Sequence, residues 1–581
     1  MRNERTSEQP HEFGFGVPSR DPLGSGIEEP RCSAEPLGRR SARSPSHHRN
    51  YISSSDGTAR ASEFYSKRFH EHRPVRTHLP GNAGTPLRIM KFGGTSVGDA
   101  SAIKKVVAII RAAARESNVV VVVSAMSGMT NKLIEAATQS EAGNRERVAT
   151  IFEELRKQHD TVVSALIPSA AEQNRVGRIV QEIFQEGDRL CQGTILLREL
   201  TLQARDSISS LGERLSAPLV AAALAERGVA SQAIEATALV VTNSDHGTAE
   251  PLMGLTRERC EARLRPLLKQ GIIPVVTGFI GATAEGTLTT LGRGGSDYSA
   301  TILGAALDAD EVIIWTDVDG LLTADPRLVP SACTIREISY RDAAELAHFG
   351  AKVLHPKTLR PLMQTGIPVW IRNTFAPELH GTKITSTGPS NGGGVKALSA
   401  ISDAALITVA GPGTERMRDV LGRTFSTTAA VRADVLLISQ SCSQNDIRFV
   451  IPAALANRTL EALRSEFAQD LAHKRVDHIT LDSTVAIIAA VGQSMSGTSG
   501  IAGRMLSALA RENVSIIAVA QGSSACNMYF VVAQKDVNAA LVAAHGEFRL
   551  GAQNSQAPRL SSSCATTGKL EPTVPRARFK E

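Results

Sequence analysis

The last third of the chain repeats itself, and this repeat restricts the fold more than any other feature. When the sequence is shifted by 81 residues, the same residue types recur at equivalent positions. The matched pairs are Gly411 and Gly492, Gly422 and Gly503, Arg423 and Arg504, Ser426 and Ser507, Gln440 and Gln521, and Phe449 and Phe530. Each copy has the pattern strand, glycine loop, helix, strand, turn, strand. The sequence therefore predicts two copies of one small α+β module.

The segment before the repeat alternates between two patterns. From Arg88 to about Lys383, short β-rich runs are separated by stretches with helical periodicity. The clearest runs are "RIMKFGG", "VVVVVSA", "IIPVVTGFIG", "DEVIIWTD" and "IPVWIRN". Between the first two runs, one helical face gathers Ile103, Val106, Val107, Ile110 and Ala114. This alternation predicts an α/β domain with a largely parallel sheet.

Composition excludes several classes of protein. Residues 1–85 have 13 basic and 10 acidic side chains, and residues from Arg549 onward have 6 and 2, so the net charge of +6 leaves −1 for the long middle. That middle has no excess charge to attract a phosphate backbone, and aromatic residues are only 4% of the chain, so we expect no nucleic-acid partner. No apolar run is long enough for a membrane span, so we expect no membrane partner either.

The cysteines and the two ends of the chain add to this picture. The seven cysteines are scattered and never form a CxxC pair, which indicates a reducing compartment, and we expect a cytoplasmic protein with no metal site. Residues 1–85 and 549–581 are rich in Ser, Pro and Arg without sustained periodicity, and we expect both to be disordered.

The run "KFGGTSVGDA" has the composition of an anion-binding loop. A strand ends at Lys91, Gly93 and Gly94 allow close backbone approach, and Thr95 and Ser96 offer hydroxyl groups. A helix is expected to follow, and its N-terminus suits an anion. The chain contains neither GxxxxGK[ST] nor GxGxxG with its acidic partner. An ordinary structural loop remains the alternative.

The run "TLGRGGSDYSATIL" places Arg293 and three glycines directly before Ser296 and Asp297. A tight turn before a helix capped by Ser296 or Asp297 is the structural alternative. In "SLGERLSAPL", Glu213 follows a glycine at a predicted helix start, where a carboxylate is also favoured as a plain cap.

Two further clusters are polar loops. In "WTDVDGLLTADPR", polar residues crowd behind a strand, at the end where ligands bind in open α/β sheets. An EF-hand is excluded because the oxygen ligands are too few, and a plain polar turn stays open. In "FGAKVLHPKT", Lys352 precedes a proline-bounded turn, and an exposed lysine is the alternative.

Together and in this order, these motifs resemble those of the aspartate kinases, within the amino-acid-kinase superfamily. The resemblance is closest to the kinase portion of the bifunctional enzymes that also carry homoserine dehydrogenase. It covers roughly Arg88 to Phe548 and rests on "KFGGTSVG", "SLGERLS", "GFIG", "TLGRGGSDYSA", "WTDVDGLLTADPR", "ELAHFGAKVLHPKT" and "IPVWIRNT". It implies a carbamate-kinase-like three-layer α/β sandwich and identifies the repeat as a tandem pair of α+β ACT domains.

The resemblance also implies an activity and a set of roles. The reaction would transfer the γ-phosphoryl group of ATP, with Mg²⁺, to the β-carboxylate of L-aspartate. Catalytic roles are implied for Lys91 and Asp297. Contacts with aspartate are implied for Thr95, Ser96, Glu213, Phe279, Arg293 and Ser296. Nucleotide contacts are implied for Gly93, Gly94, Thr316, Asp317, Arg327 and Lys352. Many relatives have tyrosine where this chain has Leu322, which puts adenine stacking at that position in doubt.

Regulation and assembly follow from the same resemblance. The runs "LISQSCSQNDIRF" and "AVAQGSSACNMYF" resemble effector loops of the threonine-sensitive class, so Gln440 and Gln521 are expected to bind threonine, with lysine as the alternative effector. ACT modules of this family complete their sheets across subunits, which implies a dimer or larger homo-oligomer. After Phe548 only 33 residues follow, without a nucleotide fingerprint. We therefore expect a monofunctional kinase or a truncated product of a bifunctional ancestor.

The expected organisation has six segments. They are an extension (1–85), a catalytic domain (86–385), a linker (386–396), a first ACT domain (397–470), a second ACT domain (471–548) and a tail (549–581). Two other functions stay open. A kinase for another amino acid such as glutamate would share the anion loop, and a catalytically inactive amino-acid sensor would keep the ACT modules.

Overall fold

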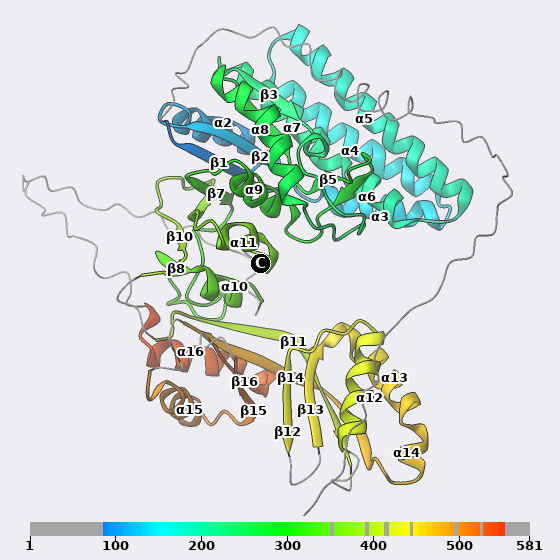
Figure 1. Ribbon diagram of the computed structural model, residues 1–581, viewed down its shortest axis with the longest axis vertical. Helices are drawn as coiled ribbons and strands as arrows, with labels where there is room; N and C mark the ends of the chain where they lie inside the picture. Colours follow the sequence, from blue (N-terminus) through cyan, green and yellow to red (C-terminus); the bar gives the residue numbers. More distant parts are fainter. Residues whose placement is uncertain are drawn as a thin grey trace, which may run out of the picture. The chain divides into compact units, whose positions relative to one another are not determined.

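The computed structural model describes residues 85–348, 354–389, 394–411, 417–441, 446–492, 495, 498–522 and 527–551. We call residues 85–389 the N-terminal region and residues 394–551 the C-terminal region (Figure 1). The predicted extension and tail lie almost wholly outside the described residues. None of the described helices is both long enough and apolar enough to cross a membrane.

The N-terminal region alternates strands and helices, as its sequence pattern predicts. Its strands are β1 (Leu87–Phe92), β2 (Asn118–Val123), β3 (Ser231–Ile234), β4 (Ile273–Thr277), β5 (Ile280–Ala282), β6 (Leu288–Thr290), β7 (Glu311–Thr316), β8 (Glu337–Ser339), β9 (Val369–Asn373) and β10 (Thr382–Thr385). Its helices are α2 (Ala100–Ala113), α3 (Met129–Glu141), α4 (Arg145–Leu166), α5 (Ala170–Leu197), α6 (Leu202–Ser209), α7 (Leu211–Ala225), η1 (Ala236–Ala238), α8 (Met253–Lys269), α9 (Gly295–Ala306), α10 (Tyr340–His348) and α11 (Pro356–Met363).

Eight of these strands form one sheet in the order β3-β4-β2-β1-β7-β9-β10-β8. Neighbouring strands are parallel except β9 and β10, which are antiparallel. The prediction of a largely parallel sheet is confirmed. β5 and β6 form a separate antiparallel hairpin.

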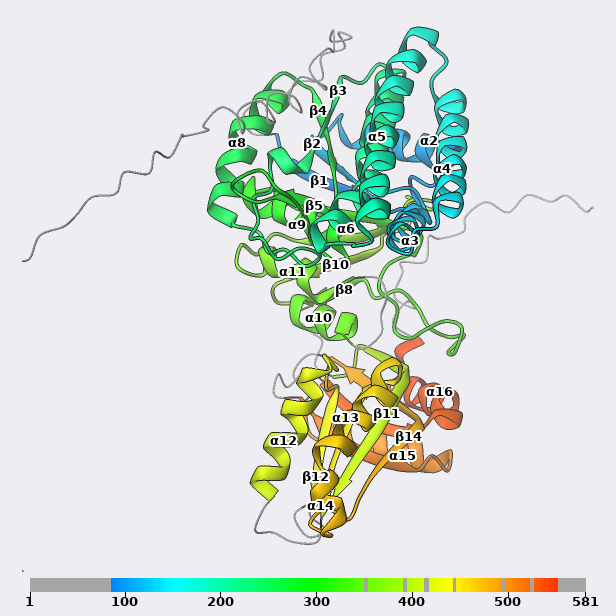
Figure 2. The ribbon, with the colours of Figure 1, turned by 90° about the vertical axis from the view of Figure 1, so that its right-hand side faces the viewer.

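Helices cover both faces of this sheet. Val120 and Val122 of β2 pack in one core with α8 and α9, and Val119, Val121 and Val123 pack in a second core with α2, α4, α5 and α7. Burial on both faces explains why β2 is a continuous valine run rather than an alternating one. Figure 2 shows α8 on one side of the sheet and α4 and α5 on the other. The region therefore has three layers.

One predicted strand is two strands in the structure. The run "IIPVVTGFIG" reads as a single strand, but β4 ends at Thr277 and β5 begins at Ile280. Between them, Phe279 has a φ of 69°. A non-glycine residue in the left-handed region breaks a strand, and such strain is concentrated at functional sites. The prediction of one strand is wrong because apolar content gives no sign of this turn.

The C-terminal region contains the two repeated modules. The first contributes β11 (Ala397–Ala410), α12 (Met417–Ala430), β12 (Leu437–Ser441), β13 (Asp446–Pro452), η3 (Ala453–Leu455), α13 (Ala456–Glu466) and α14 (Ala468–Ala472). The second contributes β14 (His478–Val491), α15 (Ile501–Arg511), β15 (Ile516–Gln521), β16 (Asn527–Ala533), η5 (Gln534–Asp536) and α16 (Val537–Glu547). The order strand, helix, strand, strand is confirmed in both copies. Each copy has a further helix after its last strand, α13 in the first and α16 in the second.

The modules share their longest strands in one sheet of order β12-β13-β11-β14-β16-β15. The first half of β11, from Ala397, pairs with the second half of β14, and the second half of β11 pairs with the first half of β14. Register shifts between Ile401 and Leu406 interrupt this ladder. Figure 1 shows β11 and β14 side by side. On their outer sides, only residues 404–410 of β11 pair with β13, and only residues 485–491 of β14 pair with β16. The first half of each long strand therefore extends the sheet of the other module.

Candidate active site

A large cavity lies at the carboxyl ends of the central strands of the N-terminal region. Its volume is about 1420 Å³, and residues that follow β1, β2, β4 and β7 line it. These four strands are neighbours in the sheet, so their carboxyl ends meet at one edge, where open α/β sheets bind ligands. The cavity exceeds the size typical of a site for one small ligand.

Most of the predicted site residues line this one cavity. They are Lys91, Gly93, Gly94, Thr95, Glu213, Phe279, Arg293, Ser296, Asp297, Thr316 and Asp317. They come from segments that are far apart in the sequence, so the fold, and not local spacing, brings them together.

Lys91 and Asp297 form an ion pair inside the cavity. The distance from Lys91 Nζ to Asp297 Oδ1 is 2.6 Å, and the two side chains are only 9% and 13% exposed. The last residues of β1 place the lysine, and the first turn of α9 places the aspartate. A shielded ion pair of this kind holds the ammonium group in a fixed position. The attraction between its charges is stronger than in a surface ion pair, because less water screens them.

Glu213 is a buried carboxylate in the first turn of α7, with 3% of the residue exposed. Burial raises its pKa to about 7, and this change is opposed by a backbone hydrogen bond from Ala125, by the Ser296 hydroxyl and by the charge of Lys91. The hydroxyl of Ser296 donates to Glu213 Oε1 at 3.4 Å. A plain helix cap is usually exposed to water, whereas Glu213 is buried and lines the cavity.

Neither Ser296 nor Asp297 caps helix α9. The N-cap residue is Gly294, which has a φ of 68° and makes no side-chain cap hydrogen bond. The structural alternative for this run, a helix capped by Ser296 or Asp297, is therefore wrong. Because glycine adopts the left-handed turn, the side chains of Ser296 and Asp297 are left free to contact Glu213 and Lys91.

The loop after β1 differs from its predicted form at one point. The helix α2 does not begin next to Thr95. Instead its N-cap is Asp99, whose carboxylate accepts from Ala102 N at 2.8 Å. The N-terminus of α2 is thus already capped by a carboxylate of the chain. Anion binding at this helix end stays a prediction, and Gly93 and Gly94 line the cavity.

Five predicted site residues are not among those that line the cavity. The hydroxyl of Ser96 pairs with the Thr374 hydroxyl at 2.8 Å. The side chain of Arg327 is 83% exposed and pairs with Asp325. Lys352 lies outside the described residues. Gln440 and Gln521 are exposed on β12 and β15 of the C-terminal region.

The cavity also contains residues that the sequence motifs did not predict. One group is Ser124, Ala125, Met126, Ser127, Gly128 and Thr130, directly after β2. The signal was present, because "SAMSGMT" follows the strand that pairs with β1 and is rich in small and hydroxyl residues. A second group is Asp206 and the loop from Ser244 to Thr248. These residues have no motif, and only the fold reveals them.

Comparison with protein families agrees with this architecture. Residues 86–373 match the model of the amino acid kinase family, and residues 407–467 and 488–548 each match the model of the ACT domain. The predicted fold class, an α/β amino-acid-kinase fold followed by tandem ACT domains, is confirmed.

Individual relatives narrow the assignment. The chain is 33% identical over 479 residues to bifunctional aspartokinase/homoserine dehydrogenase 1 of Arabidopsis thaliana, which covers 81% of this chain and 52% of that protein. It is 32% identical over 455 residues to lysine-sensitive aspartokinase 3 of Escherichia coli, which covers 77% of this chain and 96% of that protein. The chain belongs to the aspartokinase family. It spans about half the length of the bifunctional relatives that it matches.

Solved structures show the same likeness. The crystal structure of E. coli aspartokinase III in complex with aspartate and ADP matches with a TM-score of 0.67 and 29% identity, over 80% of this chain and 100% of that chain. The same enzyme in complex with lysine and aspartate also matches with a TM-score of 0.67, over 79% of this chain and 99% of that chain.

Proposed function

We propose that this chain is an aspartate kinase. It transfers the γ-phosphoryl group of ATP to the β-carboxylate of L-aspartate and forms 4-phospho-L-aspartate, the first step of lysine, threonine and methionine biosynthesis. The observation that carries the proposal is the shared cavity, in which the Lys91–Asp297 ion pair lies with Glu213 and Arg293. Membership of the aspartokinase family supports it.

The charges of the cavity suit aspartate. This substrate has two carboxylates and one ammonium group, so its site needs at least one fixed cation and one anion. Arg293 supplies a planar guanidinium that binds a carboxylate through two parallel hydrogen bonds. Glu213 supplies the anion for the ammonium group, and a bound ammonium would favour the ionised form of this carboxylate. Contacts with Thr95, Phe279 and Ser296 complete the aspartate side.

Phosphoryl transfer needs in-line positioning and neutralisation of charge more than covalent help. Lys91 stabilises the moving phosphoryl group, and Asp297 orients Lys91. The backbone amide of Gly94 approaches the phosphates, and Gly93, whose N–H donates to the Trp315 carbonyl at 3.0 Å, leaves room for them at the cavity wall. Thr316 and Asp317, directly after β7, hold the nucleotide, and we propose the same role for Arg327 and Lys352.

The donor set of the cavity fits Mg²⁺ that arrives with ATP. Among the described residues, no group of three or more His, Cys, Asp or Glu is placed to hold a metal ion. Mg²⁺ in kinase sites is bound by one or two carboxylates together with phosphates and water, and Asp317 and Asp297 offer such carboxylates. The ion would supply charge neutralisation on the phosphates.

Regulation is the second part of the proposal. We infer that threonine, with lysine as the alternative effector, binds the ACT modules near Gln440 and Gln521 and inhibits the kinase. The equivalent positions of the two glutamines in the repeat support a shared role. We further expect a homo-oligomer of at least two chains, and the scattered cysteines are compatible with a reducing compartment such as the cytoplasm.

Formation of aspartyl-hydroxamate by the purified chain, with ATP and Mg²⁺, tests the activity. Glutamate serves as the control substrate, and threonine or lysine is added in parallel. We expect aspartate-selective activity. Equal use of glutamate would support a kinase of different specificity. No activity from a folded chain that still binds threonine would support the sensor alternative and contradict the proposal.

A further inference from the structure

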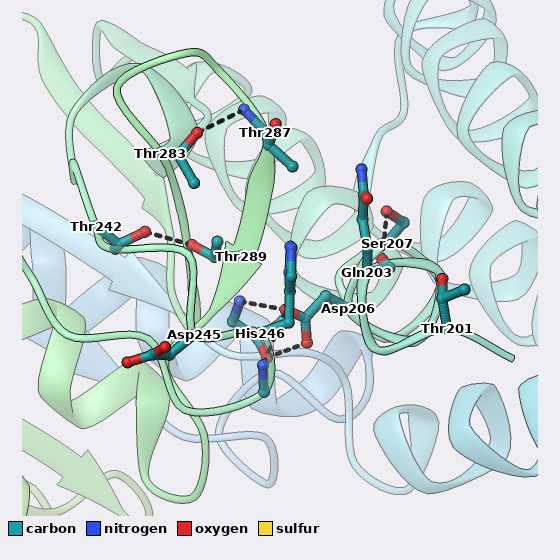
Figure 3. A network of polar contacts seen from close by, with 12 residues as sticks. Thr201, Gln203, Asp206, Ser207, Thr242, Asp245, His246, Thr283, Thr287 and Thr289 are labelled. Carbon is teal, nitrogen blue, oxygen red and sulfur yellow. Dashed lines mark hydrogen bonds and ion pairs between the residues drawn. The ribbon is translucent and has the colours of Figure 1, made fainter.

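A single buried carboxylate connects three segments beside the proposed aspartate site. Asp206 lies in α6 and is 3% exposed. Its Oδ2 accepts hydrogen bonds from His246 Nδ1 at 2.9 Å, from Gly247 N at 3.0 Å and from Thr290 N at 3.1 Å. Its Oδ1 accepts from Thr290 Oγ1 at 2.6 Å. Figure 3 shows the side chain of Asp206 pointing from α6 toward the loop that carries His246.

The segments that Asp206 joins lead directly to Arg293. Thr290 is the last residue of β6, and only Leu291 and Gly292 separate it from the arginine. Asp206 therefore fixes both the backbone and the side chain of the strand end that carries Arg293.

The loop that holds His246 supports the same turn from the other side. Gly292 has a φ of 80°, and a Cβ atom there would lie 3.0 Å from the carbonyl oxygen of Gly247 and 3.7 Å from Thr248 Cα. Ala249 N also donates to the Thr290 carbonyl at 2.9 Å. Because Asp206 binds Gly247 and Thr290 at once, it holds the loop and the turn against each other.

A buried carboxylate is costly unless several donors compensate for its lost hydration. Asp206 has four such donors, which is enough to keep the network fully satisfied. The location is informative as well, because Asp206, His246, Gly247, Thr290 and Arg293 all line the same cavity.

We propose that Asp206 is a positioning residue that holds Arg293 in the orientation that binds the carboxylate of aspartate. This inference rests on the proposed function, in which Arg293 contacts aspartate. Asp206 acts through hydrogen-bond geometry and does not contact the reacting atoms. The four recorded bonds of its carboxylate lead to the loop around His246 and to Thr290, whereas the nucleotide side after β7 is built from other residues. Its loss should therefore affect aspartate and spare ATP.

The test compares Asp206→Ala with Asp206→Asn. Alanine removes all four acceptor bonds, so we expect the KM for aspartate to rise by roughly tenfold or more, with the KM for ATP unchanged within about twofold. Asparagine keeps an amide oxygen for the three N–H donors, and the Thr290 hydroxyl can accept from the new NH₂ group. We expect Asp206→Asn to restore a KM for aspartate within a few-fold of the wild type.

The control variant is Thr289→Val, one residue before Thr290. Thr289 lies in the same hairpin, and its hydroxyl pairs with the Thr242 hydroxyl at 2.7 Å, as Figure 3 shows, rather than with Asp206. This variant should leave the KM for aspartate unchanged. If Thr289→Val and Asp206→Ala raise it equally, the network only stabilises the hairpin, and the inference is wrong. It is also wrong if Asp206→Ala raises both KM values equally, or if asparagine is as poor as alanine.

Should Asp206→Ala fail to fold, Thr290→Val gives the same answer. Valine is nearly isosteric and removes only the 2.6 Å hydroxyl bond to Asp206. A rise of several-fold in the KM for aspartate alone supports the inference, and no rise overturns it.

Calorimetric titration of the wild type with aspartate and with MgADP separates failure of the proposed function from failure of the inference about Asp206. If the wild type neither binds nor phosphorylates aspartate, the proposed function fails and the inference with it. A functional wild type with indifferent variants refutes the inference alone.

Discussion

At the scale of single residues, the charged groups of the cavity carry most of the chemistry, and Lys91 is the most testable of them. Its ammonium group is held 2.6 Å from Asp297 in a shielded position. Lys91→Met should keep the fold and lower kcat by a factor on the order of a thousand, the scale of losing a central transition-state charge. The matched control is Lys132→Met, which breaks a surface ion pair with Glu154 of 2.7 Å and should leave kcat unchanged. Near wild-type turnover by Lys91→Met would remove it from the mechanism.

Arg293 should affect the binding of aspartate and not the binding of ATP. Arg293→Ala should raise the KM for aspartate by about 10- to 100-fold, the cost of losing a charge-assisted hydrogen bond, and should change the KM for ATP far less. Arg257→Ala is the comparison, because Arg257 pairs with Asp308 at the surface, outside the cavity. Steady-state kinetics with each substrate varied in turn measures both constants. Equal effects on both would mean that Arg293 does not mark the aspartate site.

Glu213 links activity to stability through its pKa. Burial raises this pKa from 4.5 to about 7. The folded state therefore favours the protonated form, so the stabilising contribution is complete below pH 4.5 and is lost as the pH rises through 7. Glu213→Gln mimics the protonated form. At pH 8.5 it should be more stable than the wild type by roughly 3 kcal/mol, because a pKa difference of one corresponds to about 1.36 kcal/mol.

The same variant should lose this advantage as the pH falls toward 5, and its KM for aspartate should rise because the anion is gone. Chemical denaturation at both pH values measures the first effect, and kinetics the second. Equal stability of the two proteins at pH 8.5 would show that burial imposes no cost on the ionised form of Glu213.

Sequence patterns predicted the residues with local motifs and missed those defined by long-range contacts. Lys91, Glu213, Arg293 and Asp297 each stand in a motif, and the structure brings all four to one cavity. Asp206 lies in a short helix without a motif, and its partner Thr290 is 84 residues away. No local pattern encodes a contact at that separation.

At the scale of elements, the turns between strands and helices decide which side chains reach the cavity. The periodicity predicted β1, β2, β7 and β9 well, because buried parallel strands are continuous apolar runs. It joined β4 to β5, because the left-handed Phe279 between them is apolar as well. It also misjudged the start of α9, where a glycine and not a hydroxyl or carboxylate side chain makes the cap.

The turn at Gly294 gives a prediction at this scale. Its φ is 68°, and a Cβ atom would lie 2.7 Å from the Cβ of His355. Gly294→Ala should cost about 1–3 kcal/mol of stability and shift the first turn of α9, which lowers kcat through Asp297. The control is Gly286→Ala, which has a φ of 90° but open space around it. Thermal unfolding and kcat are measured for both variants. Equal losses of stability and of kcat in the two would show that backbone strain alone is responsible and that α9 is not displaced.

At the scale of the whole molecule, the repeat predicted two modules but not how they join. β11 and β14 exchange halves, so each module is completed by a strand segment of the other. Pairing between β11 and β14 runs along the full length of both strands, and a repeat in the sequence contains no information about this pairing. The two modules therefore share one continuous sheet.

The C-terminal region also contacts the loop that follows β7. His545 of α16 is 2% exposed, and its Nε2 lies 3.0 Å from the Thr323 hydroxyl. Burial lowers the pKa of His545, which favours the neutral ring. Thr323 is four residues before Arg327, in the loop proposed to hold the nucleotide. An effector that moves α16 can therefore disturb ATP binding through this contact. Allosteric inhibition requires that the contacts differ between the active and the inhibited state.

The effector proposal yields the last prediction. Threonine at about 1 mM should inhibit the wild-type protein. Gln440→Ala and Gln521→Ala should each raise the half-inhibitory concentration by roughly tenfold, the cost of a lost hydrogen bond to the effector, with uninhibited kcat unchanged. Gln469→Ala, an exposed glutamine on α14, is the control and should keep wild-type sensitivity. Because the two modules share β11 and β14, we expect the two sites to be coupled. The double variant should therefore raise the half-inhibitory concentration by more than the product of the two single increases. Unchanged sensitivity in all variants, to threonine and to lysine, would place the effector site elsewhere.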